Sequence, residues 1–122
     1  MPHIIVTTPP NYTPPRPWRD ILISLSRTLA GLNPTFQLSD CKARTVSAVE
    51  SVVGDGSPTR DHLLIAIEVW VMPGRPDDLL RQVGPALRDQ MATLLTPTPP
   101  PIEVTVDVQE LSGPRYSKVL LQ

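Results

Sequence analysis

Apolar and polar side chains alternate most regularly near the end of the chain, over residues 102–109. Such alternation is typical of a half-buried β-strand. A longer run over residues 62–71 is mostly apolar on both faces, which predicts a central strand or one pressed against a partner subunit. Two more stretches, 4–6 and 42–53, are rich in β-branched residues. We therefore expect four strands in all.

Two other segments repeat their apolar residues every three or four positions, the spacing of one side of an α-helix. The first is expected over residues 18–32. The second follows a proline and carries its apolar stripe from Leu80 to Leu94, with Gly84-Pro85 in between. An interior proline costs about 3 kcal/mol or more and kinks a helix. The stripe keeps its phase across this point, so we expect one bent helix.

The expected elements follow the order β-α-β-β-α-β, in which one β-α-β unit occurs twice. Two such units side by side predict an α+β fold, a four-stranded sheet with two helices on one face. We expect a single domain over residues 1–122, with repeats at about 2–56 and 62–111 and a C-terminal arm at 112–122. The other sheet face has no cover within the chain, which predicts oligomerisation.

Composition narrows the possible functions. The chain has 122 residues and a formal net charge of −1, so no strong field favours nucleic acid or an anionic membrane. No apolar run approaches the roughly 20 residues of a membrane span, and no leader suggests export. Cys41 is the only cysteine, which excludes an internal disulfide and fits a reduced cytoplasm. We expect neither a metal site nor a cofactor.

The start of the chain offers a candidate base. Proline in second place lets the initiator methionine be removed, which would leave the secondary amine of Pro2 at the head of a strand. The reference pKa of an α-amino group is roughly 7.7–8.0. The proline amine is more basic, and burial and nearby cations would lower its pKa toward neutrality. Such a base suits proton abstraction, although proline often stands second in chains that need no base.

Three cations are candidates for binding a carboxylate. Arg75 lies at the exit of the central strand, where binding groups usually lie, and a guanidinium can hold a carboxylate through two parallel hydrogen bonds. Lys42 and Arg44 are two residues apart at the start of the second strand, so both project from one face. The alternative for each is an exposed surface cation, which is the usual fate of Lys and Arg.

These segments together resemble the tautomerase superfamily, the amino-terminal-proline enzymes, and within it the 5-carboxymethyl-2-hydroxymuconate isomerases. The resemblance covers nearly the whole chain and depends on the order and spacing of short motifs. The motifs are Pro2-His3-Ile4-Ile5-Val6, Cys41-Lys42-Ala43-Arg44, Gly74-Arg75 and the segment from Val106 to Leu111.

The resemblance implies a homotrimer with inward-facing sheets that acts on a small carboxylic acid in aromatic degradation. It implies that Pro2 is the catalytic base and then the acid, moving a proton to a distal carbon of a dienol acid. By position, Arg75 would bind a carboxylate or carbonyl. Lys42 stands where the isomerases have a functional arginine, and Arg44 is the next arginine of that motif. Lysine lacks arginine's planar fork, so the substrate can be another enol or α-keto acid, or an unsaturated acid that takes up water.

Two other functions stay open. The first is a non-catalytic trimer of the same fold that binds a small acid or a protein partner, since a fold does not guarantee chemistry. The lysine at position 42 supports this alternative. The second is a regulatory ferredoxin-like domain that senses a metabolite between helices or subunits, for which the presence of Met1 would not matter.

Overall fold

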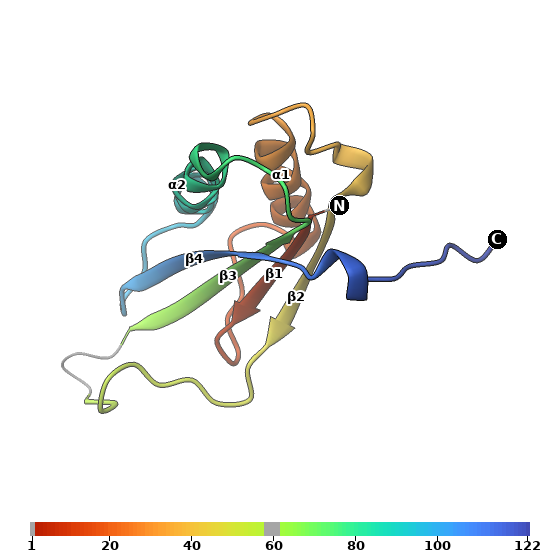
Figure 1. The fold of residues 1–122 in the computed structure, drawn as a ribbon. Helices are drawn as coiled ribbons and strands as arrows, with labels where there is room; N and C mark the ends of the chain where they lie inside the picture. The colour runs from red at the N-terminus through yellow and green to blue at the C-terminus, as the bar shows by residue number, and fades with distance from the viewer. Residues whose placement is uncertain (1, 58–61) are drawn as a thin grey trace.

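The computed structural model describes residues 2–57 and 62–122, which form a sheet covered by helices (Figure 1). The expected β-α-β-β-α-β order is confirmed. Two short 3-10 helices are added, one before the second strand and one after the last strand. The elements are β1 (His3–Thr8), α1 (Trp18–Ala30), η1 (Leu38–Asp40), β2 (Lys42–Ser47), β3 (Leu63–Val71), α2 (Asp77–Leu94), β4 (Ile102–Glu110) and η2 (Gly113–Arg115).

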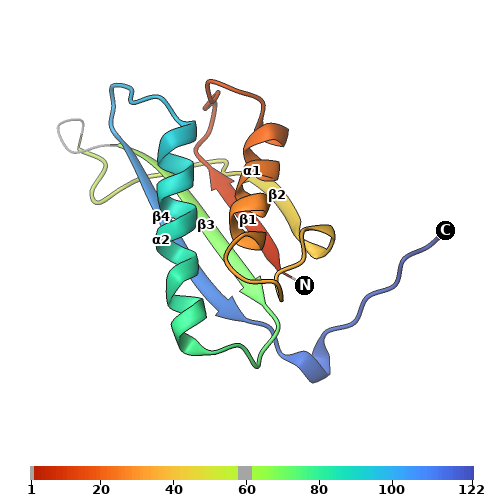
Figure 2. The same cartoon turned by 90° about the horizontal axis from the view of Figure 1, so that it is seen from above.

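The four strands form a mixed sheet in the order β2-β1-β3-β4. β1 runs parallel to β2, and β3 runs parallel to β4. The two parallel pairs meet at the centre, where β1 and β3 are antiparallel. Both helices lie on one face of the sheet, as Figure 2 shows. The α+β architecture expected from the sequence is therefore confirmed, with β2 and β4 as the two edges of the sheet.

The core lies between the sheet and the two helices. Every second side chain of β1 and β3 enters it, because successive side chains of a strand point to opposite faces. α1 and α2 each turn one apolar stripe toward the sheet. The core side chains with no exposed surface are Ile4, Val6, Ile21, Leu25, Leu29, Ile65, Val69, Val71, Val83, Leu87 and Met91.

The opposite face of the sheet is not covered by α1 or α2, and we call it the open face. Its side chains alternate with those of the core, so the strand register identifies them. Apolar, cationic and anionic positions are mixed on it. The open face consists of His3, Ile5, Thr7, Lys42, Arg44, Val46, Leu64, Ala66, Glu68, Trp70, Glu103, Thr105, Asp107 and Gln109.

The second strand is shorter than its sequence suggests. β2 ends at Ser47, whereas the β-branched residues predicted a strand as far as Val53. Its partner β1 ends at Thr8, whose carbonyl accepts a hydrogen bond of 2.9 Å from the N–H of Ala48. Because alternate residues of a strand face alternate neighbours, the next N–H facing β2 would belong to residue 10, and Pro10 has none to continue the ladder. The end of β2 is therefore set by its partner and not by its own propensity.

The helices differ from expectation only in detail. α2 continues as one helix across Pro85. Its buried stripe begins at Leu79 rather than at Leu80. α1 ends at Ala30, before the expected residue 32. No helix within the described ranges is long and apolar enough to cross a membrane.

The C-terminal residues form an extended arm rather than a strand. After η2 the chain leaves the body of the molecule, as both ribbon views show. Val119, Leu120 and Leu121 are 80%, 81% and 86% exposed. A C-terminal arm was expected over residues 112–122, and these residues form no helix or strand after η2.

The sequence Gly54-Asp55-Gly56-Ser57-Pro58 is typical of a turn, and the structure describes it as far as Ser57, because Pro58 lies outside the described residues. Gly54 and Gly56 have φ angles of 64° and 73°. This is the left-handed region, which glycine enters without steric cost. The glycines are therefore needed where they stand.

Two glycine substitutions test this account of α2 and the turn. A Cβ at Gly84 would have no atom within 4 Å, so Gly84→Ala is expected to raise the free energy of unfolding by about 1 kcal/mol. Gly56→Ala is the matched control. Its Cβ would lie 3.0 Å from Cγ2 of Val52 at a positive φ, so stability should fall. Urea unfolding measures both, and a Gly84→Ala variant no more stable than wild type would contradict the account.

Candidate active site

Pro2 is buried at the head of β1. Its carbonyl accepts a hydrogen bond of 3.0 Å from the backbone N–H of Lys42. This bond extends the ladder between β1 and β2 by one step, so the backbone of Pro2 is held against the sheet. Alternation along the strand puts the proline ring on the same side as Ile4, which is the side of the helices.

Lys42 and Arg44 lie together on the open face. Lys42 is in register with His3, and Arg44 with Ile5, and residues in register project to the same face. The Nζ of Lys42 donates a hydrogen bond of 3.1 Å to the carbonyl of Asp40. The backbone of Lys42 and Arg44 therefore lies beside the start of β1, where Pro2 is. Their side chains, however, project from the sheet face opposite to the proline ring.

A cavity of about 320 Å³ occupies this end of the open face. Arg44 was expected at a binding site from the sequence, whereas the aromatic side chains around it were not. His3 Nε2 lies 3.2 Å from the hydroxyl of Tyr116, and the two rings meet edge to face with centroids 5.9 Å apart. The cavity is lined by His3, Ile5, Arg44, Trp70, Leu111 and Tyr116.

The surroundings of His3 keep its imidazole neutral. Partial burial lowers the pKa of His3 from its ordinary value of 6.5, and the positive charges of Arg44 and Lys42 lower it further. A neutral ring offers one nitrogen as donor and the other as acceptor. His3 can therefore either donate a hydrogen bond to the Tyr116 hydroxyl or accept one from it. This contact anchors the start of the C-terminal arm beside the cavity.

Arg75 lies in the turn between β3 and α2 and joins two segments. Its Nε and Nη2 donate to the hydroxyl and the carbonyl of Thr35 at 3.3 and 3.0 Å. Its Nη1 donates to the carbonyl of Met72 at 3.2 Å. The guanidinium carbon also lies 4.4 Å from the ring centroid of Phe36. These contacts hold the loop after α1 against the turn after β3, and none of them involves Lys42 or Arg44.

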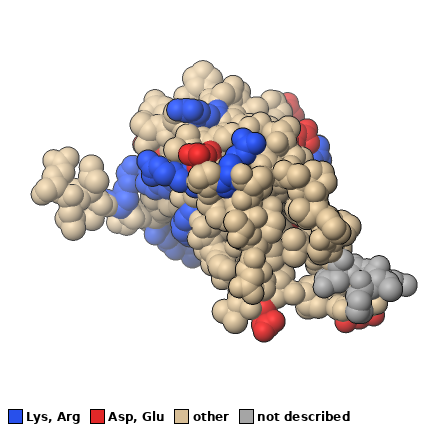
Figure 3. Space-filling model, turned by 180° about the vertical axis from the view of Figure 1, so that it is seen from behind, with Lys and Arg blue, Asp and Glu red and all other residues tan. Residues whose placement is uncertain are grey.

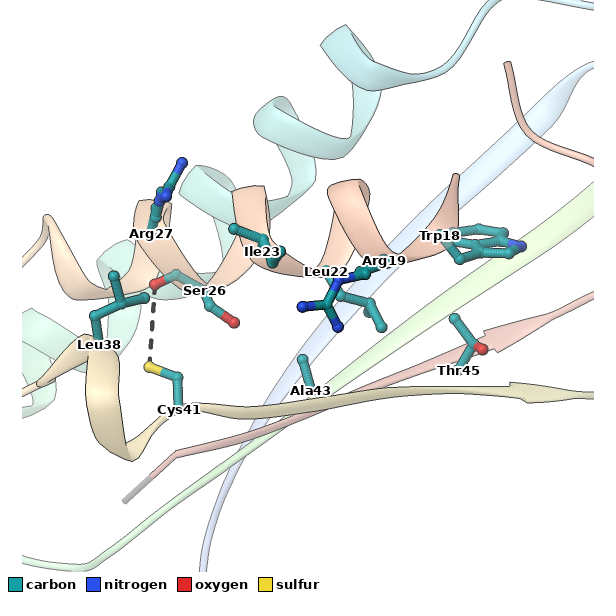
Figure 4. Close-up of a pocket in the computed structure, with 10 residues that line it drawn as sticks. All are labelled: Trp18, Arg19, Leu22, Ile23, Ser26, Arg27, Leu38, Cys41, Ala43 and Thr45. Atoms are coloured by element: carbon teal, nitrogen blue, oxygen red, sulfur yellow. Dashed lines mark hydrogen bonds between the residues drawn. The ribbon is translucent and has the colours of Figure 1, made fainter. Parts of the chain in front are cut away.

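A second cavity, of about 540 Å³, lies between α1 and β2 on the helix side of the sheet (Figure 4). Cys41 faces it, and its Sγ donates to the carbonyls of Gln37 at 3.5 Å and Ser26 at 4.0 Å. Burial raises the pKa of the Cys41 thiol, and Asp40 raises it further. A protonated, hydrogen-bonded thiol is a weak nucleophile. The lining residues are Trp18, Arg19, Leu22, Ile23, Ser26, Arg27, Leu38, Cys41, Ala43 and Thr45.

Metal binding finds no support in the part of the chain that the structure describes. Within residues 2–57 and 62–122, no three His, Cys, Asp or Glu side chains are grouped so as to hold an ion. The residues at the head of β1 that could take part in chemistry are therefore Pro2, two cations and a histidine.

No family model matches the sequence, and no curated protein matches it either. Solved structures do match. A 5-carboxymethyl-2-hydroxymuconate isomerase from Deinococcus radiodurans R1 has a TM-score of 0.74 at 20% identity, over 97% of this chain and 88% of its own. A 5-carboxymethyl-2-hydroxymuconate delta-isomerase has a TM-score of 0.81 at 14% identity, over 98% and 88%. A fused 4-OT described as a symmetric trimer has a TM-score of 0.59 at 17% identity, over 87% and 84%.

The chain has the tautomerase fold. The resemblance read from the motifs is thereby confirmed at the level of the fold. At 20% identity or less, a shared tautomerase fold does not carry activity or substrate from one protein to another. Those must be argued from the residues of this chain.

Arg75 offers a test of how the tautomerase fold is held together in this chain. Arg75→Ala removes three hydrogen bonds and the contact with Phe36, so the free energy of unfolding should fall by about 2 kcal/mol. Arg81→Ala is the matched control, because Arg81 forms only an exposed ion pair with Asp77, worth at most about 1 kcal/mol. Urea unfolding of both variants measures the two losses of unfolding free energy. Equal, small losses would mean that the contacts of Arg75 hold nothing.

His3 gives a pH-dependent prediction. The unfolded chain takes up a proton near pH 6.5, whereas folded His3 has a lowered pKa and resists protonation. Acid therefore favours the unfolded state, and stability should fall as the pH drops from about 7 to about 5. His3→Gln removes this titration and keeps a polar group beside Tyr116. Melting temperatures at the two pH values should show a smaller fall in the variant, and an equal fall in both proteins would refute this role of His3.

Proposed function

We propose that the protein is a cofactor-free tautomerase or isomerase that moves a proton within an enol or dienol carboxylic acid. The amine of Pro2 acts first as the base and then as the acid. The observation that carries this proposal is the buried position of Pro2 at the head of β1, where the N–H of Lys42 bonds to its carbonyl. The fold supports it as well, because two isomerases of known structure share it.

The mechanism requires that Met1 be removed. While Met1 is attached, the nitrogen of Pro2 belongs to a tertiary amide and has no basic lone pair. After removal, Pro2 is a secondary amine at the start of a strand. Partial burial and the charges of Lys42 and Arg44 would lower its pKa toward neutrality, and such an amine can both accept and return a proton.

The proposed reaction is balanced without a redox partner. Pro2 takes a proton from the enol oxygen, or from the carbon next to the carbonyl, while the electron pair shifts along the conjugated system. The same proton is then delivered to a distal carbon. Substrate and product are isomers, so the reaction consumes no cofactor.

Three cations are proposed to bind the acid. Lys42 and Arg44 supply positive charge at the end of the sheet where Pro2 lies. Arg75 has five N–H groups, of which three bond to Thr35 and Met72. The remaining two N–H groups are enough to bind a carboxylate or a carbonyl oxygen. Arg75 can therefore bind a substrate while it still holds its loop in place.

We also propose that the protein works as a homotrimer in the cytoplasm. The open face leaves Ile5, Leu64 and Trp70 without a cover from α1 or α2, and such a face is expected to pack against other subunits. The fused 4-OT with the same fold is a symmetric trimer. The free thiol of Cys41 fits a reducing compartment.

A non-catalytic trimer that binds a small acid or a protein partner is the second candidate. The observation that favours it is that the candidate cations are poorly suited, or only partly free, to bind a carboxylate. Arg75 already bonds to Thr35 and Met72, and Lys42 offers a point charge rather than a planar fork. Such a protein would bind acids without depending on the Pro2 amine.

The proline base is tested by two variants and a control. Pro2→Ala and a variant with one glycine inserted before Pro2 should each lower kcat/KM for ketonisation of an aryl enolpyruvate, by about 10² to 10⁴ for the loss of a placed general base. The inserted glycine keeps Pro2 but makes its nitrogen an amide. Pro15→Ala, in an exposed loop position, is the matched control and should retain activity.

The outcomes separate the two functions. Loss of activity in both variants, with activity kept in Pro15→Ala, supports the proline base. Wild-type activity in either variant refutes it. Acid binding in all four proteins, with turnover in none, would favour the binding module.

A further inference from the structure

The chemistry proposed for Pro2 makes no use of the cavity between α1 and β2. We call it the helix-side cavity, and its lining residues are the ten that Figure 4 labels. Its volume of about 540 Å³ falls within the range of small-molecule sites in proteins. Pro2 is not among its lining residues, and Lys42 and Arg44 project from the opposite face of the sheet. The helix-side cavity is therefore a separate place for a ligand.

A buried hydroxyl without a partner opens onto the helix-side cavity. Ser26 is 7% exposed, and within the described ranges its hydroxyl forms no hydrogen bond. Every fully enclosed polar side-chain atom of these ranges has a partner, so the Ser26 oxygen must reach the free space of the cavity that it lines. Figure 4 shows this oxygen pointing from α1 toward β2. A buried hydroxyl with no protein partner costs free energy unless water or a ligand bonds to it.

Arg19 brings an unpaired positive charge to the same space. Figure 4 shows its guanidinium turned from α1 toward Ala43 of β2. The guanidinium forms no ion pair or hydrogen bond with any residue of the described ranges. Arg27 also borders the cavity, but its guanidinium points away from β2. Of the two arginines that line the cavity, Arg19 is therefore the one placed to meet an anion inside it.

The surroundings of the cavity are positively charged. Residues 2–47, which hold β1, α1 and β2, contain five Lys and Arg but only two Asp. Figure 3 shows most of the cationic side chains gathered on the side from which the C-terminal arm projects. Cys41 adds no negative charge, because burial raises the pKa of its thiol and keeps it protonated. A concave site in a positive field favours an anionic ligand.

Apolar surface separates the guanidinium from the hydroxyl. Leu22 of α1 and Ala43 of β2 line the cavity from its two sides, with the guanidinium of Arg19 between Trp18 and Ser26 (Figure 4). Arg19 and Ser26 are seven residues apart, which is about 10 Å along the helix axis at 1.5 Å per residue. One aromatic ring with a hydrogen-bonding group at each end, together with its two hydrogen bonds, has about this length.

We propose that the helix-side cavity binds a small aromatic acid. The carboxylate bonds to the guanidinium of Arg19, which can hold it through two parallel hydrogen bonds. A polar group at the opposite end of the ring bonds to the hydroxyl of Ser26, and the ring packs between Leu22 and Ala43. This inference goes beyond the proposed isomerase, because binding here involves neither the Pro2 amine nor a proton transfer.

The two tryptophans of the chain make binding at this site visible. Trp18 lines the helix-side cavity, whereas Trp70 lines the cavity on the open face. In a Trp70→Phe protein, the fluorescence of Trp18 therefore reports on the helix-side cavity alone. The probes are para-hydroxybenzoate, benzoate, which lacks the hydroxyl group, and phenol, which lacks the carboxylate. We expect para-hydroxybenzoate to bind more tightly than either of the other two.

Three further substitutions in the Trp70→Phe protein test the contacts. Arg19→Gln should raise the dissociation constant of para-hydroxybenzoate about tenfold or more, because a charge-assisted hydrogen bond is lost. Arg27→Gln is the matched control and should leave the constant unchanged. Ser26→Ala should raise the constant about threefold for para-hydroxybenzoate and leave that of benzoate unchanged. Its free energy of unfolding should stay at the wild-type value, because the hydroxyl has no partner in the protein.

These losses, with an unaffected Arg27→Gln control, establish the site. The inference is overturned if Trp18 does not respond to millimolar para-hydroxybenzoate, if Arg19→Gln and Arg27→Gln behave alike, or if Ser26→Ala weakens benzoate as much as para-hydroxybenzoate. A response of Trp70 in a Trp18→Phe protein, without one from Trp18, would put the acid on the open face and overturn it too. Pro2→Ala should bind para-hydroxybenzoate normally, so failure of the catalytic proposal is seen separately in kcat/KM.

Discussion

β1 pairs with a strand on each of its sides, and this pairing determines how the sheet and the candidate site are arranged. Its parallel partner β2 fixes the carbonyl of Pro2 through the N–H of Lys42. Its antiparallel partner β3 brings Trp70 level with His3 at the same end of the sheet. Backbone hydrogen bonds thus bring Pro2, the cations of β2 and the aromatic side chain of Trp70 to the same end of the sheet. The helices bury the other face of the sheet.

This constraint gives the proposed chemistry its physical basis. A base must be held where its lone pair can reach the substrate and where water does not compete for it. Pro2 is held because it stands at the first rung of a ladder. The cations nearby leave the sheet on the open face, so in the proposed mechanism they would act on Pro2 through space and on a substrate through charge. They do not form a closed ring around the proline.

Much of the fold could be predicted from the sequence because its signals are local. Alternation over β4 and the apolar run of β3 identify strands and their buried faces, and apolar spacing identifies both helices. The length of β2 could not be predicted from its own residues, because it is set by its partner strand, where Pro10 lacks the N–H that would continue the ladder. The contacts of Arg75 with Thr35 join residues 40 positions apart, and those of His3 with Tyr116 join residues 113 apart. No local pattern reports such pairs, so the candidate site was named only in part.

The proposed mechanism requires that Pro2 carry a free amine of near-neutral pKa in the folded protein. A pH titration of protein labelled with ¹⁵N-proline, followed by NMR, measures it directly. We predict one proline nitrogen that titrates, with a pKa lowered by burial and by the cations at the head of β1. A spectrum in which every proline nitrogen behaves as an amide at all pH values would contradict the account.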